Sequence, residues 1–125
     1  MGKIQSFREL RVWQAAMELV VNVYRISAIF PVTENHGLTS QIRRASVSVP
    51  SNIAEGFGRH NYKEYIHFLR IANGSLAELE TQTEIALRLG FISQDTFTEM
   101  LELCVSLRKQ LIAQQNALSK SEPRT

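Results

Sequence analysis

Residues 43–59 read "RRASVSVPSNIAEGFGR", and whether they form a helix or a strand decides the fold class of the whole chain. The run "RASVSV" alternates as a strand would, but Pro50 lacks the backbone donor that a central strand needs. Apolar residues at helical spacing extend through the segment and beyond it: Leu38, Ile42, Ala45, Val49 and Ile53. We therefore expect a helix over about residues 38–57, bent at the proline and ended by Gly56 and Gly58. The bend either shapes the bundle or exposes Arg43 and Arg59 to a partner, and we favour shape.

The same spacing predicts three more helices, over about residues 7–30, 61–90 and 93–119. Pro31 ends the first. Asn61, with Glu64 three residues later, caps the next helix, and Ser93 caps the last. The seam of the last helix consists of Phe97, Met100, Leu101, Cys104, Leu111, Gln115 and Leu118. Short links between four helices predict an all-α fold, an antiparallel up-down four-helix bundle. We assign residues 1–119 to this single domain and residues 120–125 to a flexible tail.

The first helix has a wider apolar surface than one bundle requires. Its apolar residues form two lines, Leu10, Trp13, Met17, Val20 and Tyr24 in one and Val12, Ala16, Leu19, Val23, Ile26 and Phe30 in the other. Together they cover an arc of roughly 240°, against the ~100° that a one-sided surface helix uses. Either this helix is central within the monomer, or another subunit covers one of its lines. We favour the second alternative, and therefore a ring-like homo-oligomer.

Polar residues form a line beside the apolar seam of residues 38–57, and a matching line lies on the following helix. We expect a structural polar seam made of Arg44, Ser48, Asn52, Glu55, Ser75 and Glu78. Arg44 is expected to pair with Glu78, within a subunit or across an interface. Gly74 is a possible point of close backbone packing beside this seam.

Positive charge is concentrated in the first half of the chain. Residues 1–62 hold seven Lys or Arg and four Glu, whereas residues 63–125 hold seven basic and eight acidic residues. Ten of the fourteen cations are arginine, which suits bidentate contacts to phosphate or carboxylate. The candidates for nucleic-acid binding are Arg43, Arg44, Arg59, Arg8, Arg11 and Arg25. The alternative is that these arginines join helices or subunits, and for Arg44 alone we favour that alternative.

Enzymatic and metal-dependent functions find little support in the sequence. His36, His60 and His67 do not follow a metal-ligand spacing, and Ser48 has no base near it in the sequence, so we expect no catalytic residues, no metal and no cofactor. Cys104 lies in an apolar pattern and is expected to be a buried, reduced thiol. No apolar run approaches about 18 residues, and no signal peptide is recognisable, so we expect a cytoplasmic protein without a membrane partner.

Four blocks together resemble a known family. They are "LRVWQAAMELV", "FPVTENHGLTSQIRRA", "SVPSNIAEGFGR" and "FLRIANGSLAELETQTEIA", in order over roughly residues 7–92. The chain resembles the bacterial 23S ribosomal RNA intervening-sequence proteins, which are four-helix bundles. The resemblance implies a homopentamer without enzymatic activity. It also implies kinship with the accessory variability determinant protein of diversity-generating retroelements, which binds nucleic acid and a reverse transcriptase. The positions that match the family motif are Arg43, Arg44, Ser48, Asn52, Glu55, Gly56 and Arg59.

Two functions are therefore expected. The first is a nucleic-acid-binding accessory factor, in which five copies bring their arginines together against RNA or DNA. The alternative is a scaffold for a reverse transcriptase or a ribosome-associated protein, without direct contact to nucleic acid. The acidic stretch from Glu80 to Glu102 fits the second function, although a solvated surface explains those charges equally well.

Overall fold

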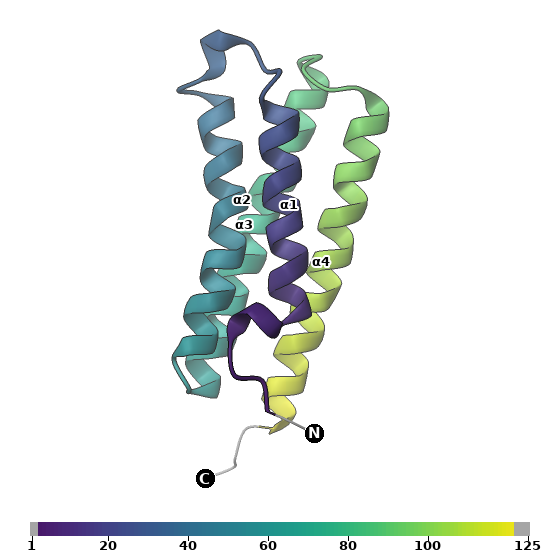
Figure 1. The fold of residues 1–125 in the computed structure, drawn as a ribbon. Helices are drawn as coiled ribbons and strands as arrows, with labels where there is room; N and C mark the ends of the chain where they lie inside the picture. Colours follow the sequence, from purple (N-terminus) through teal and green to yellow (C-terminus); the bar gives the residue numbers. More distant parts are fainter. Residues whose placement is uncertain (1–2, 122–125) are drawn as a thin grey trace.

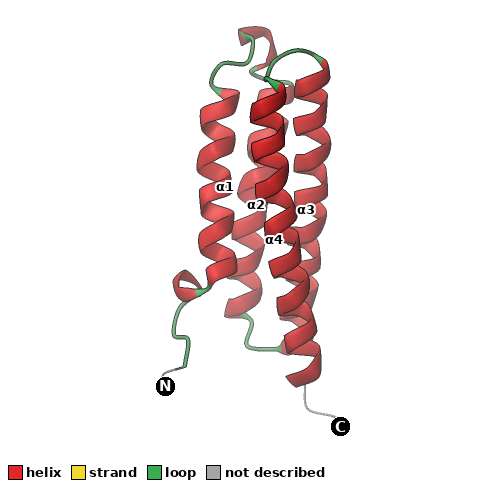
Figure 2. Ribbon diagram, turned by 90° about the vertical axis from the view of Figure 1, so that its right-hand side faces the viewer, coloured by secondary structure: helices red, strands yellow, loops and turns green. Residues whose placement is uncertain are grey.

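The computed structural model describes residues 3–121, and in this range the chain forms four long helices and no strand. The helices are α1 (Arg11–Ser27), α2 (Leu38–Gly58), α3 (Tyr62–Arg88) and α4 (Gln94–Ser121), with two short 3-10 helices, η1 (Phe7–Glu9) and η2 (Val32–Glu34). Successive helices run in opposite directions with their axes roughly aligned (Figures 1 and 2). The expected all-α, up-down four-helix fold is confirmed. Helix α4 reaches Ser121, and residues 122–125 of the expected tail lie outside the described residues.

The first helix is shorter than the sequence predicts, because its beginning is a separate turn. Ser6 and Glu9 form a capping box: Ser6 Oγ accepts from the Arg8 amide at 3.2 Å, and Glu9 Oε2 accepts from the Ser6 amide at 2.9 Å. Leu10 then has an extended backbone, with ψ 125°. The apolar spacing runs through Leu10 without a break, so it gave no sign of this interruption. As a result η1 lies against the end of α2 (Figure 1).

The other helix ends are set by local signals, most of which the sequence carries. Asn61 Oδ1 accepts from the Glu64 amide at 3.1 Å, and Ser93 Oγ accepts from the Thr96 amide at 3.1 Å, which confirms both predicted N-caps. Gly90 follows α3 with a φ of 79°. The link between α2 and α3 is different, since its left-handed residue is His60, with a φ of 55°.

Helices α2 and α3 form the most extensive pair in the bundle. Helix α2 continues through Pro50, which is buried, as is the predicted seam from Leu38 to Ile53. Gly56 is buried at a point where the two helices approach closely, because a Cβ there would lie 2.8 Å from Phe68 Cβ. The expectation for Gly74 was wrong: a Cβ at that position meets nothing within 4 Å. Gly56, inside α2, allows the close approach instead.

Candidate nucleic-acid interface

One of the two apolar lines of α1 enters the core, and part of the other stays exposed. Val12, Ala16, Leu19, Val23 and Phe30 are buried. Met17 is 39% exposed, Val21 45% and Tyr24 43%, and these three residues are called the exposed apolar face of α1. Val47, on the neighbouring helix α2, is 41% exposed. Of the line from Leu10 to Tyr24 the monomer therefore leaves Met17 and Tyr24 uncovered, whereas Leu10 is buried and Trp13 and Val20 are half-buried. Val21 belongs to neither predicted line.

Arg43 joins the end of α1 to the beginning of α2. Its Nε donates to Ser27 Oγ at 2.8 Å, its Nη2 donates to the Tyr24 carbonyl at 3.4 Å, and its guanidinium lies 4.5 Å from the centre of the Tyr24 ring. Ser27 is buried, so this arginine is held in a fixed position against α1. The guanidinium still has donors that these two bonds do not use.

Arg43 lies in a basic area that we call the α1–α2 corner, defined by Tyr24, Arg25, Arg43, Arg44 and Val47. Arg25 and Arg44 are exposed, and neither forms an ion pair within residues 3–121. A surface hollow lies between the two helices here, with Tyr24, Arg43, Arg44 and Val47 among its lining residues, and a second hollow lies beside Arg25 along α1. The corner thus combines unpaired positive charge with an exposed aromatic ring.

The remaining predicted arginines lie at the other end of the bundle, where α1 begins and α2 ends. The Arg8 guanidinium lies 4.8 Å from the centre of the Phe7 ring. Arg59 forms an ion pair with Glu55 at 2.8 Å and lies 5.1 Å from the centre of the Phe68 ring. Arg11 is exposed. The six candidate arginines therefore form two groups, at opposite ends of α1 and α2, and not one continuous surface.

The predicted polar seam is only partly formed. The hydroxyls of Ser48 and Ser75 are 2.8 Å apart and join α2 to α3, and Asn52 Nδ2 donates to both the carbonyl and the hydroxyl of Ser48, at 2.8 and 2.9 Å. Arg44 and Glu78 are both exposed and form no ion pair within the part of the chain that the structure describes. The pairing expected inside a subunit is wrong, and pairing across an interface stays a prediction.

Comparison with known proteins identifies the family. The family model of the 23S rRNA-intervening sequence proteins matches residues 8–113, which cover α1, α2 and α3 in full and α4 as far as residue 113. The chain belongs to this family. A crystal structure of a protein with unknown function from the S23 ribosomal protein family of Bacteroides thetaiotaomicron is similar, with a TM-score of 0.75 and 21% identity over 83% of this chain and 97% of that chain. This likeness supports the fold alone. No curated protein matches the chain.

Two features of this 23S rRNA-intervening sequence family member were not predicted from its sequence. Tyr24 was assigned to an apolar line, but its ring is exposed and stacks with Arg43. Arg108 of α4 forms an ion pair with the largely buried Glu80 of α3. Both contacts join residues far apart in the chain, so local sequence patterns do not reveal them. For Tyr24 the one sequence signal was its position directly before Arg25.

Neither a cluster of metal ligands nor an exposed cysteine occurs in the described residues. No three His, Cys, Asp or Glu side chains in residues 3–121 gather as metal ligands do. Cys104 is buried and free, as expected, and burial raises the pKa of its thiol to about 12. A thiol of this kind is a poor nucleophile at neutral pH. No helix in this range is long and apolar enough to cross a bilayer.

Proposed function

We propose that this protein is a non-enzymatic accessory factor that binds RNA or DNA through the arginine-rich surface of a homopentamer. The observation that carries the proposal is the α1–α2 corner. There, Arg25 and Arg44 have no acidic partner and lie near an exposed tyrosine ring. Phosphate contacts by arginine supply most of the affinity of sequence-independent binding, and aromatic rings stack on unpaired bases.

Self-association is supported by the exposed apolar face of α1 and the adjacent Val47. A contiguous apolar surface of this kind marks an interaction site more often than it marks a free surface. Five copies would repeat the corner around an axis. A strand that contacts several corners at once gains affinity through effective concentration, so three arginines in each copy are enough for firm binding.

The test has two parts. Sedimentation equilibrium gives the mass of the protein in solution, and five times the chain mass of 14.2 kDa is expected. Fluorescence anisotropy with a labelled single-stranded RNA, and with DNA of the same sequence, then gives Kd at 50 and 200 mM salt. Three phosphate contacts predict a slope of about −2 for the logarithm of the binding constant against the logarithm of the salt concentration. Between the two salt concentrations Kd should therefore rise roughly twentyfold for each engaged copy. A flat salt response, or no binding at micromolar protein, overturns the proposal.

A matched pair of variants locates the surface. Arg44→Ala removes an unpaired, exposed arginine from the corner, and Arg70→Ala removes an equally unpaired, exposed arginine from α3. We expect the first to weaken binding and to lower the salt slope by about 0.7 per copy, and the second to leave both unchanged. Equal effects would mean that binding follows net charge and not the corner.

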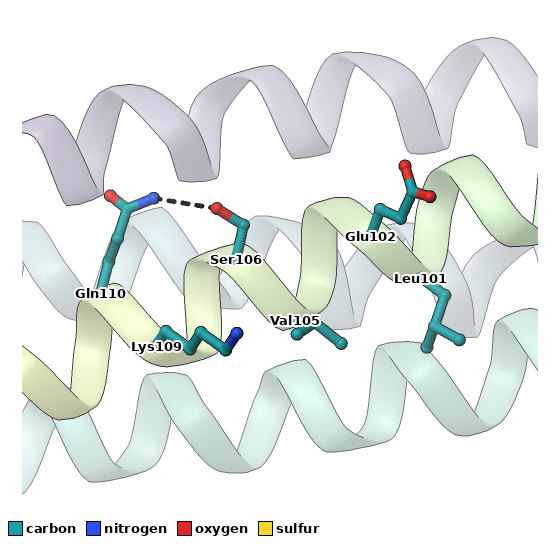
Figure 3. Close-up of a pocket in the computed structure, with 6 residues that line it drawn as sticks. All are labelled: Leu101, Glu102, Val105, Ser106, Lys109 and Gln110. Atoms are coloured by element: carbon teal, nitrogen blue, oxygen red, sulfur yellow. Dashed lines mark hydrogen bonds between the residues drawn. The ribbon is translucent and has the colours of Figure 1, made fainter.

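A second candidate function is a scaffold for a reverse transcriptase or a ribosome-associated protein. The observation that favours it is a surface hollow of about 520 Å³ on α4. Leu101, Val105 and Lys109 point to one side of the helix, and Glu102 points to the other (Figure 3). Leu101 is exposed although the sequence places it in the core seam. Pull-down before and after nuclease treatment separates the two functions, because scaffold partners survive the nuclease and nucleic-acid-dependent partners do not.

A further inference from the structure

The hollow at the α1–α2 corner has an unusual lining. Its volume is about 400 Å³, roughly that of a dozen water molecules, so a phosphate group and part of the molecule that carries it can enter. Six of its seven lining residues carry polar side chains. They are Tyr24, Asn35, Thr39, Ser40, Arg43 and Arg44, and Val47 is the seventh. The residues come from α1, from the link and from the first three turns of α2.

Thr39 lacks a partner that a buried hydroxyl normally has. The residue is only 6% exposed, it lines the hollow, and its Oγ1 is buried without a hydrogen bond. The other buried threonine, Thr83 of α3, bonds its own helix through Oγ1 to the Leu79 carbonyl at 2.7 Å. Burying an unpaired hydroxyl is unfavourable, and because Oγ1 itself has no exposed surface, a ligand in the hollow completes it only after a rotation about χ1 of Thr39.

Thr39 also lies in the first turn of α2, where backbone amides have no partner within the helix. The Leu38 amide donates to Glu34 Oε1 at 3.0 Å, and the Gln41 amide donates to the Gly37 carbonyl at 3.0 Å. The amides of Thr39 and Ser40 lie between these two. Together with the partial positive charge of a 21-residue helix, they favour an anion at this position.

The two arginines of the hollow follow from α2 itself. Arg43 and Arg44 are each four residues after Thr39 and Ser40, so they lie one helical turn away on the same sides of the helix. Arg43 is held by Ser27 and Tyr24, and Arg44 is free to close on a ligand. The carboxylate of Glu34 lies at the start of α2, where it accepts a hydrogen bond from the Leu38 amide. Its negative charge opposes the binding of an anion here.

We propose that the start of α2 binds one phosphate group of a nucleic-acid strand. The amides of Thr39 and Ser40 and the hydroxyl of Thr39 donate to it, and the guanidinium of Arg44 neutralises it, with Arg43 behind. The proposal rests on the nucleic-acid function proposed above. It adds a defined position at which the strand is held, through an uncharged hydroxyl and backbone amides that a purely electrostatic surface does not need.

The experiment uses the full chain, labelled with ¹⁵N, and two probes at matched ionic strength: inorganic phosphate and a short single-stranded RNA. Both probes should shift the amide signals of Thr39 and Ser40, and chloride should not. Thr39→Val keeps the shape of the side chain and removes the hydroxyl. It should weaken the binding of both probes about tenfold, with the melting temperature unchanged or raised, since an unpaired buried hydroxyl is lost.

A charge variant provides the second arm. Glu34→Gln retains an acceptor for the Leu38 amide and removes the opposing charge, so it should strengthen phosphate binding several-fold. If RNA binds but neither amide shifts and Thr39→Val binds normally, the phosphate site is wrong and the nucleic-acid function stands. If phosphate shifts the amides and no strand binds, the site stands for a free phosphate monoester and the nucleic-acid function falls. If neither probe binds, both fall.

Discussion

Replacing Gly56 by alanine tests the packing on which the bundle depends. The added Cβ would lie 2.8 Å from Phe68 Cβ, 3.1 Å from Tyr65 Cδ1 and 3.2 Å from the Tyr65 carbonyl oxygen. Carbon atoms in contact are normally about 3.5–4.0 Å apart, so α2 and α3 must separate locally. Overpacking costs about 1–3 kcal/mol, and the upper half of this range applies because backbone and Cβ atoms cannot rotate away. Alanine regains about 1 kcal/mol of helix propensity.

The net expectation for Gly56→Ala is a loss of about 1–2 kcal/mol in the free energy of unfolding. Urea denaturation followed by circular dichroism measures it, with all variants at one protein concentration, since the stability of an oligomer depends on concentration. Gly74→Ala is the matched control, because nothing lies within 4 Å of its added methyl group and about 1 kcal/mol should be gained. The reasoning is refuted if Gly56→Ala is as stable as the wild-type chain or more so.

Three further predictions concern a thiol, a left-handed residue and an ion pair. The pKa of the Cys104 thiol is raised from 9.0 to about 12, so the thiol ionises first in the unfolded chain, and stability should be full below about pH 9 and fall towards pH 12. In denaturation series Cys104→Ala should reduce this loss without removing it, because burial also raises the pKa of Tyr65. His60→Gly should raise stability by about 1 kcal/mol in thermal melts, because a left-handed φ costs a non-glycine residue roughly that much. A double-mutant cycle on Glu80 and Arg108, which link α3 and α4, should give a coupling of about 1 kcal/mol, above the ~0.3–0.5 of exposed pairs on one helix.

The sequence predicts what local chemistry determines. Asn61 and Ser93 cap their helices through residues three positions away, so both N-caps were predicted correctly. The capping box of Ser6 and Glu9 is equally local, but the uninterrupted apolar spacing through Leu10 concealed it. Local signals are therefore sufficient where they agree with the apolar pattern, and they are overlooked where the two compete.

Contacts between helices are less predictable, because they depend on how each helix is rotated about its axis. Gly56 and Gly74 are both small residues beside a polar line, yet only Gly56 faces a neighbouring helix. The bond from Arg43 to Ser27 joins residues 16 positions apart, and the stacking on Tyr24 follows from the same rotation. The candidate arginines were found by composition, but their division into two groups required the structure.

The direction of the chain in the bundle decides how the molecule can be labelled. Helix α1 begins and α4 ends at one end of the bundle, whereas α2 begins at the other end (Figure 1). Because α1 has 17 residues, the two ends are separated by about 25 Å along its axis. A dye or a surface tether attached before α1 or after α4 therefore stays clear of the start of α2. Energy transfer from such a dye to a labelled oligonucleotide would report which end of the bundle the oligonucleotide occupies.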